Sequence, residues 1–142
     1  HLADEVGNFV LRRKDQLFSY QLAVVVDDAQ QKISHIIRGS DLYQQTPQQV
    51  WLQACLNYKQ PSYGHLPIII NGQGQKLSKQ NLATPLDMLQ APALMSEALE
   101  RLGHPTPCGL RRAPVAEQLE WATGQWDIEC VPKRMQDPIA FV

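Results

Sequence analysis

The chain has 142 residues, of which 44% are hydrophobic and 19% charged, and its formal net charge at pH 7 is -1. This balance is typical of one globular domain and excludes a generally basic nucleic-acid-binding protein, although a local basic patch stays open. The longest apolar runs, residues 22–26 and 66–70, fall far short of the ~20 residues of a membrane-spanning helix, which excludes a membrane protein. The prolines and glycines follow no period, which excludes a collagen-like chain.

The cysteines are few and far apart. Cys55, Cys108 and Cys130 form no C-x-x-C pair, so neither a disulfide framework nor a zinc knuckle is expected. Cys55 lies in an apolar helical context, which predicts a small buried thiol. This cysteine usage predicts a reducing, cytoplasmic location. The chain begins with His1 and carries no signal-peptide pattern, so we expect it to come from the middle of a longer protein.

The first part of the chain is expected to combine strands with a helix. The predicted elements are a hairpin around the basic residues 12–14, a buried strand at 22–26 followed by two aspartates, a strand at 33–37, a helix from 46 and a buried strand at 65–70. Thr46, Pro47 and Gln49 form a capping-box pattern at the helix start. A flexible loop at 71–75 follows the last strand. This order is typical of an α/β fold.

The remaining residues are expected to be all helical. Pro85 and Pro114 each mark a helix start, and Gly103 and Gly124 mark stops. An apolar face with helical spacing is expected to pack in the last helix, and its members are Val115, Leu119, Ala122 and Trp126. The chain is therefore divided into an α/β region at 1–82 and a helical region at 83–142.

A candidate phosphate site follows the loop at 71–75. Lys76 and Lys79 stand three residues apart with Ser78 between them, behind Gly72 and Gly74. Ammonium groups on a mobile loop can close on a polyphosphate. The segment is not a P-loop, because the G-x-x-x-x-G-K-[ST] spacing is missing. A solvated surface loop remains the alternative.

Arg38 is a candidate carboxylate ligand, because it follows a predicted buried strand and a guanidinium can pair with a substrate carboxylate in a bidentate manner. The alternative is an ion pair with Asp27, Asp28 or Asp41. Tyr20 precedes the run at 22–26 and can line a pocket for a small polar ligand, or it is an ordinary aromatic residue.

Other candidates are weaker. His35 and His65 lack a G-x-S-x-G nucleophile motif, so they are expected to be core or strand-end residues. Asp27 and Asp28 are adjacent in a predicted strand and would point to opposite faces, so a turn or capping role is favoured over a metal pair. No metal ligand is assigned to this chain.

Several blocks of the sequence, taken in order, resemble the second half of the catalytic domain of glutamyl-tRNA synthetases, a class I family. The blocks are residues 20–28, 35–42, 46–47, 65–67 and 76–81. Lys-Leu-Ser-Lys-Gln at 76–80 stands where that family carries its KMSKS loop. The resemblance implies an α/β fold, namely the second half of a Rossmann-type class I catalytic domain followed by a small helical C-terminal region.

The closer resemblance is to the glutamyl-Q tRNA(Asp) synthetases, a short branch without an anticodon-binding domain. Gln80-Asn81 after the signature loop, residues 119–122 with Trp126, and Val131-Pro132 carry this resemblance. It implies a cytoplasmic, monomeric ligase that uses ATP and Mg²⁺ to attach glutamate to the queuosine base of tRNA(Asp). Its partners would be L-glutamate, ATP and tRNA(Asp) carrying queuosine.

The resemblance also implies roles for individual residues. Tyr20 and Arg38 match glutamate-binding positions. The ATP-binding positions match Lys79, Ser78 and Asp41. Lys76 and Lys79 would act catalytically by stabilising the charge that builds on the departing phosphates, which involves no proton transfer.

The chain departs from this family in one respect. The HIGH-type motif and the cysteine-rich zinc site of the family's first half are missing here, so Zn²⁺ is expected only in a preceding half. Because ATP lies across both halves of a Rossmann fold, we expect the chain alone to be inactive. Two alternatives stay open: part of a glutamyl-tRNA synthetase that charges the tRNA 3′ end, or a non-catalytic tRNA-binding module.

Overall fold

The chain packs as two units, His1–His65 and Leu66–Val142. The computed structural model describes residues 6–78 and 83–138. The sequence-based boundary between residues 82 and 83 lies inside the second unit. None of the helices in the described ranges combines the length and apolar character that a bilayer crossing demands.

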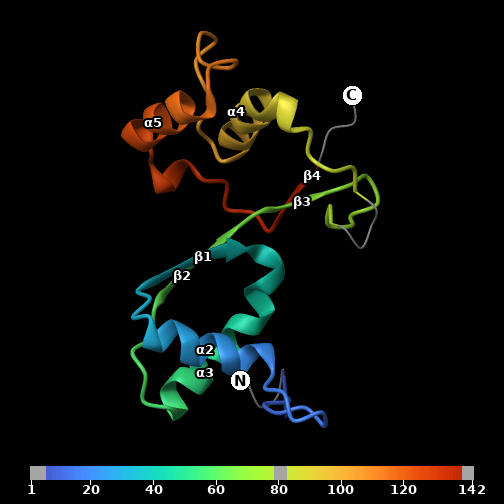
Figure 1. Cartoon of the computed structure of the whole chain (residues 1–142), viewed down its shortest axis with the longest axis vertical. Helices are drawn as coiled ribbons and strands as arrows, with labels where there is room; N and C mark the ends of the chain where they lie inside the picture. Colours follow the sequence, from blue (N-terminus) through green and yellow to red (C-terminus); the bar gives the residue numbers. More distant parts are fainter. Residues whose placement is uncertain (1–5, 79–82, 139–142) are drawn as a thin grey trace. The chain divides into compact units, whose positions relative to one another are not determined.

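The first unit joins two strands through helical segments (Figure 1). Its elements are α2 Tyr20–Gln30, β1 His35–Gly39, the 3₁₀ helix η1 Ser40–Gln45, α3 Thr46–Cys55 and β2 Ser62–Leu66. α2 packs against α3. Among the described residues of this unit, Val25 and Leu52 are the buried apolar ones.

β1 and β2 run in the same direction. The Ser62 amide donates to the Ser34 carbonyl at 2.9 Å, so the two strands begin side by side. Further along, a Cβ atom built on Gly64 would lie 2.6 Å from Cδ1 of Ile37, so the strands stay in step. Parallel strands end at a common edge. Arg38 and His65 therefore come together near the carboxyl ends of the pair.

The apolar run at 22–26 is helical, so the predicted buried strand is wrong. It lies within α2, and of the run only Val25 is fully buried, at 1% exposure. A short apolar run is compatible with a strand or a helix, and the neighbouring sequence decides. Here the polar contacts of Gln21 with α3 and η1 place one face of a helix inward. Asp27 and Asp28 consequently lie in the last two turns of a helix.

The start of α3 agrees with the sequence, but its capping does not. The helix begins at Thr46 with Pro47 in its first turn. Thr46 makes no capping hydrogen bond, because η1 runs directly into α3 and the Thr46 hydroxyl is bonded to Arg38 instead. Cys55, expected to be buried, is exposed at the end of this helix.

Two further predictions for the first 82 residues can be compared with the structure. The hairpin is confirmed, because the Arg13 amide bonds to the Leu17 carbonyl and the Ser19 amide to the Leu11 carbonyl, both at 2.8 Å. The strand predicted at 65–70 is divided into β2 and β3 Ile68–Ile70. Pro67 lies between them and lacks the amide hydrogen that a continuous ladder would use.

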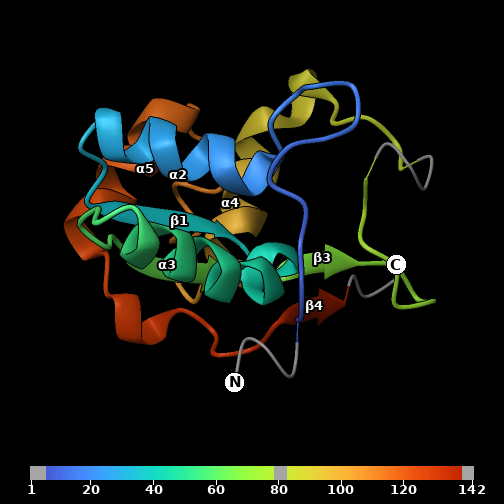
Figure 2. The same ribbon diagram turned by 90° about the horizontal axis from the view of Figure 1, so that it is seen from below.

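The second unit contains a pair of helices and a short parallel sheet. Its elements are β3, η3 Met88–Gln90, α4 Ala91–Arg101, α5 Val115–Gln125, η4 Ile128–Cys130 and β4 Gln136–Pro138. α4 packs against α5. β3 and β4 pair in parallel, and their arrows point the same way in Figure 2. The expectation that this part is all helical is therefore wrong, since β4 is a strand.

The helix starts and faces of this unit agree only in part with the sequence. α5 begins after Pro114 as predicted, whereas the first helix begins at Ala91, not at Pro85. Of the predicted apolar face, Leu119 and Trp126 are 46% and 45% exposed. The inward face instead carries Gln118, whose amide donates to backbone carbonyls of residues 92 and 113 and so binds α5 to α4.

Gly103 follows the end of α4 and packs closely against the backbone of Cys130. It has φ +82°, and an added Cβ would overlap the carbonyl oxygen of Cys130. Gly103→Ala is therefore expected to lower the free energy of unfolding by about 1–3 kcal/mol in urea denaturation. Gly124→Ala is the matched control, because Gly124 lies in α5 with open space around it, and it should be neutral or stabilising. Equal effects of the two substitutions would contradict this account.

Candidate functional site

Arg38 lies at the end of β1 and is held in place by neutral acceptors. Its Nη1 donates to Oε1 of Gln49 and its Nη2 to Oγ1 of Thr46, both at 2.8 Å. Nη2 also reaches the Leu42 carbonyl at 3.5 Å, and Nε donates to Nε2 of His65 at 3.3 Å. These groups orient the half-buried guanidinium without neutralising its charge.

The alternative of an ion pair with the aspartates after 22–26 is not found. Within the described residues, no ion pair joins Arg38 to Asp27 or Asp28. Asp28 interacts with Arg38 only through space: burial and the neighbouring Asp27 raise the pKa of Asp28, and the charge of Arg38 lowers it. The guanidinium therefore keeps a positive charge that can attract an anionic ligand.

A chain of glutamine side chains fixes the acceptor for Arg38. Gln49 is 1% exposed, and its Nε2 donates to Oε1 of Gln21 at 2.8 Å. Nε2 of Gln21 in turn donates to Oε1 of Gln45 at 2.9 Å. Because each amide donates in one direction, the Gln49 carbonyl oxygen is left facing Arg38. This network ties α2, η1 and α3 to the end of β1.

Aromatic rings surround the same guanidinium. Cζ of Arg38 lies 5.1 Å from the ring centre of Tyr63, a cation–π distance. The Tyr63 hydroxyl accepts from Nε2 of Gln53 at 2.8 Å, and burial raises its pKa. The ring of His65 lies parallel to that of Tyr63 at 6.3 Å and meets Tyr43 edge-on at 5.2 Å. The rings restrict the directions from which a ligand can approach Arg38.

These partners of Arg38 were not identified from the sequence. Tyr63 and His65 are two residues apart in β2 and therefore share a face of the strand. This spacing, on the strand that follows the one carrying Arg38 along the chain, was the signal from which the two partners could have been identified. His65 itself was expected to be a core or strand-end residue, and it lies at the strand end.

The structure places the other predicted ligands of the first unit near this cluster. Tyr20 begins α2 beside Gln21, and it is exposed. Burial is the main cause of the raised pKa of Tyr63, and an electrostatic interaction with Tyr20 is the smallest of the contributions. Asp41 lies in the first turn of η1, just after β1, and is also exposed.

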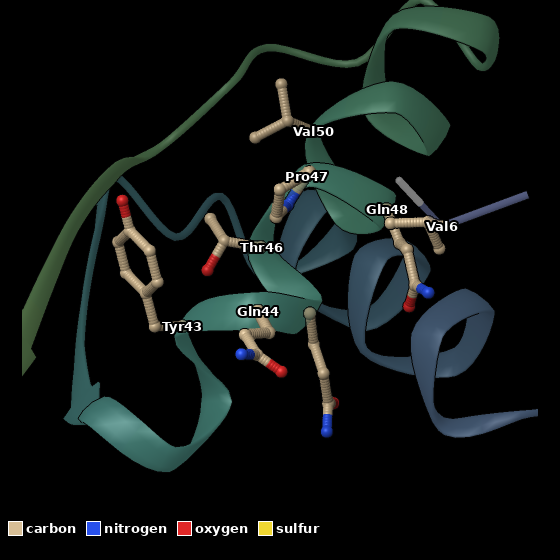
Figure 3. Close-up of a pocket in the computed structure, with 8 residues that line it drawn as sticks. Val6, Tyr43, Gln44, Thr46, Pro47, Gln48 and Val50 are labelled. Atoms are coloured by element: carbon tan, nitrogen blue, oxygen red, sulfur yellow. The ribbon is translucent and has the colours of Figure 1, made fainter. Parts of the chain in front are cut away.

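A pocket of about 860 Å³ lies against η1 and the start of α3 (Figure 3). Its wall is formed by the side chains of Val6, Tyr43, Gln44, Gln45, Thr46, Pro47, Gln48 and Val50. Arg38 is not part of this wall. The Thr46 hydroxyl connects the two features, because it accepts from Arg38 and also borders the pocket. The wall combines the apolar side chains of Val6, Pro47 and Val50 with amide and hydroxyl groups.

The candidate phosphate-binding segment belongs to the second unit. The loop before it is an ordered turn: Oδ1 of Asn71 accepts from the amides of Gln73 and Gln75 at 3.0 and 2.9 Å. Lys76 forms an antiparallel bridge with Ile70 and is exposed. Ser78 is half-buried, and Lys79 lies outside the described residues.

The described residues contain no group of three or more His, Cys, Asp or Glu side chains placed to hold a metal ion. All three cysteines are unpaired and exposed.

The contact between Arg38 and His65 predicts a pH dependence of stability. Nε2 of His65 accepts a hydrogen bond and is therefore unprotonated, and burial followed by the charge of Arg38 lowers the His65 pKa below 6.5. The unfolded chain binds a proton at a higher pH than the folded chain, so the free energy of unfolding should fall as the pH drops through 6.5 toward the lower folded pKa.

His65→Gln tests this dependence by urea denaturation between pH 7.5 and pH 5. The amide can still accept from Arg38 but does not titrate, so the loss of stability at low pH should become smaller. His35→Gln is the control, since His35 is exposed and its ring shares a hydrogen bond with the neighbouring Ser34 hydroxyl. An unchanged pH profile in His65→Gln would contradict the assignment.

Comparison with known proteins identifies the family. The family of class I tRNA synthetases (E and Q), catalytic domain, matches residues 2–107. A glutamyl-Q tRNA(Asp) synthetase of Synechococcus sp. is 57% identical over 121 residues, covering 85% of this chain and 40% of the relative. The enzyme of that name from Pseudomonas fluorescens is 46% identical over 140 residues, covering 99% and 47%. The chain thus spans less than half the length of these relatives.

Solved structures agree at the level of the fold. A glutamate–tRNA synthetase from Elizabethkingia anophelis superimposes with a TM-score of 0.69 at 20% identity, over 96% of this chain and 31% of that chain. A glutamate tRNA ligase from Elizabethkingia meningosepticum, in complex with its amino acid, gives 0.67 at the same identity and coverage. The resemblance seen in the sequence is confirmed: this chain belongs to the class I tRNA synthetases (E and Q) as part of their catalytic domain, and the glutamyl-Q tRNA(Asp) synthetases are among its relatives.

Proposed function

We propose that this chain is part of an ATP-dependent ligase that activates glutamate and transfers it to the queuosine base of tRNA(Asp). The observation that carries the proposal is the charged Arg38 guanidinium, held by neutral acceptors at the carboxyl end of a parallel strand pair. The names of the similar relatives supply the amino acid and the tRNA.

Arg38 has the donor needed for a carboxylate. A guanidinium carries five N–H groups. In this chain Nη1 gives one of its two N–H groups to Gln49, and the other has no hydrogen-bond partner in the described ranges. A glutamate carboxylate would accept from this group, with the Tyr20 hydroxyl as a second contact. Because Gln49 and Thr46 already orient the guanidinium, little conformational entropy is lost on binding.

The proposed reaction has two steps. A carboxylate oxygen of glutamate attacks the α-phosphate of ATP, which forms glutamyl-adenylate and releases pyrophosphate. A hydroxyl of queuosine then takes the glutamyl group, and AMP leaves. Lys76 and Lys79 would stabilise the negative charge on the departing phosphates, with Ser78 shaping the loop and Asp41 approaching the ATP or the amino acid. Mg²⁺ would enter with the phosphates of ATP.

We also propose that the complete active site needs more of the protein than this chain. The parallel pair β1–β2 with α3 between its strands is the unit expected in the second half of a Rossmann-type domain, and residues 83–142 would follow it as a C-terminal region. The HIGH-type motif and a zinc site would lie in a preceding half. We therefore expect no glutamate activation from the 142-residue chain alone, and a cytoplasmic monomer as the working form.

The acceptor is tested with the full-length gene product, ATP and radiolabelled glutamate. Label is expected on tRNA(Asp) that carries queuosine, and neither on tRNA(Asp) lacking queuosine nor on tRNA(Glu). The two forms of tRNA(Asp) are the matched pair, because they differ only in the modified base. Transfer to the 3′ end of tRNA(Glu) would contradict the proposal and would favour a glutamyl-tRNA synthetase.

The role of Arg38 is tested by Arg38→Gln in the full-length gene product, using glutamate-dependent pyrophosphate exchange. Loss of a charge-assisted hydrogen bond removes roughly 1.5–3 kcal/mol of binding, so the KM for glutamate should rise about 10- to 100-fold while the KM for ATP stays near its original value. Arg112→Gln is the control, because Arg112 is exposed in the second unit. A KM for glutamate that does not change in Arg38→Gln would overturn the role.

A further inference from the structure

In the second unit, the segment at residues 76–77 lies beside β3 as a third, strand-like member of the small β3–β4 sheet. The Leu77 amide donates to the Ile69 carbonyl at 2.9 Å, beside the antiparallel bridge between Lys76 and Ile70. On its other edge, β3 pairs with β4 in register Ile69↔Asp137, and the Ile68 amide donates to the Met135 carbonyl at 3.1 Å. β3 therefore stands between the lysine segment and β4.

β3 and β4 have only three residues each, so backbone pairing alone holds them together weakly. The side chain of Asp137 supplies the missing support. It is 9% exposed, and each of its carboxylate oxygens accepts from a different arginine. Nη1 of Arg101 reaches Oδ2 at 3.0 Å, and Nη2 of Arg134 reaches Oδ1 at 2.8 Å.

Arg101 connects this carboxylate to a helix. It lies at the end of α4, where its Nε and Nη2 donate to Oε1 of Glu97 one turn earlier, at 3.0 and 2.7 Å. The guanidinium is thus fixed on α4 before it meets Asp137. Removing this carboxylate would take one ion-pair partner from each arginine, although Arg101 would keep its ion pair with Glu97.

We propose that Asp137 is a positioning residue for the lysine segment: held by Arg101 and Arg134, it fixes β4, β4 fixes β3, and β3 aligns Lys76, Leu77 and Ser78. The position of this segment is thus set by a carboxylate about sixty residues further along the chain. That this alignment serves ATP rests on the function proposed above. The alignment itself does not, because it is a property of the protein without ligand.

The alignment is tested first by amide hydrogen exchange in the full-length gene product without ligand. Asp137→Ala should lower protection at least tenfold at both Ile68 and Leu77, whose amides bond within the ladder. The Leu56 amide at the end of α3 is the reference and should not change. Asp137→Glu keeps a carboxylate and should restore most of the protection.

Two further variants keep this experiment decisive. Arg134→Gln removes one of the two ion pairs of Asp137, at a half-exposed side chain. It should give a smaller loss of protection at the same amides, even where Asp137→Ala folds poorly. Glu129→Gln is the matched control, since it removes the exposed ion pair with Lys133 and should have no effect on the ladder. Unchanged protection at Leu77 in Asp137→Ala and Arg134→Gln, or an equal loss at Leu56, would overturn the proposal.

The consequence for ATP is tested by pyrophosphate exchange with the same variants. Asp137→Ala should raise the KM for ATP at least fivefold and leave the KM for glutamate unchanged, with Asp137→Glu close to the unsubstituted protein. A general loss of structure would raise both KM values and would contradict a positioning role. If the ladder loosens but the unsubstituted protein shows no ATP-dependent exchange, the proposed function fails while the structural alignment stands.

Discussion

The charge of Arg38, held among neutral acceptors, is the constraint on which the first unit depends. A half-buried guanidinium needs acceptors for its N–H groups, and Gln49, Thr46, His65 and the Leu42 carbonyl accept from most of them without adding negative charge. The same contacts draw η1, α3 and β2 toward the end of β1. The contacts that hold the cluster together therefore do not neutralise Arg38, and its charge is still available to a carboxylate.

The second unit also contains a buried charged group, but there the charge is paired with groups of opposite sign. Its buried charge is the carboxylate of Asp137, and that charge is fully paired with Arg101 and Arg134. A neutralised cluster has little attraction for an ion, and its effect is to hold short strands together. The comparison separates the roles of the two clusters: the unpaired cation is suited to binding a substrate, and the paired anion is suited to supporting the lysine segment.

Elements that depend on neighbouring residues were predicted well from the sequence, whereas elements that depend on tertiary contacts were predicted poorly. The Thr46 and Pro114 helix starts and the strand at 33–37 depend on neighbouring residues, and the structure has each of them within about two residues. The run at 22–26 was misassigned because five apolar residues suit either a strand or a helix. β4 was missed because Gln-Asp-Pro has no strand pattern, and its pairing with β3 and the ion pair between Asp137 and Arg101 involve residues distant in the sequence. Arg38 could be selected from its place at a strand end, whereas its partners come from other elements.

The most direct test of the central claim is the NMR signal of the Arg38 side-chain Nε–H during a titration of the full-length gene product with L-glutamate. The signal is assigned with Arg38→Lys. A saturable shift of this signal, absent with L-glutamine at the same concentrations or much weaker, is the predicted result, because binding places a carboxylate against a guanidinium held by neutral groups. Shifts at other arginines with the Arg38 signal unmoved would contradict the claim.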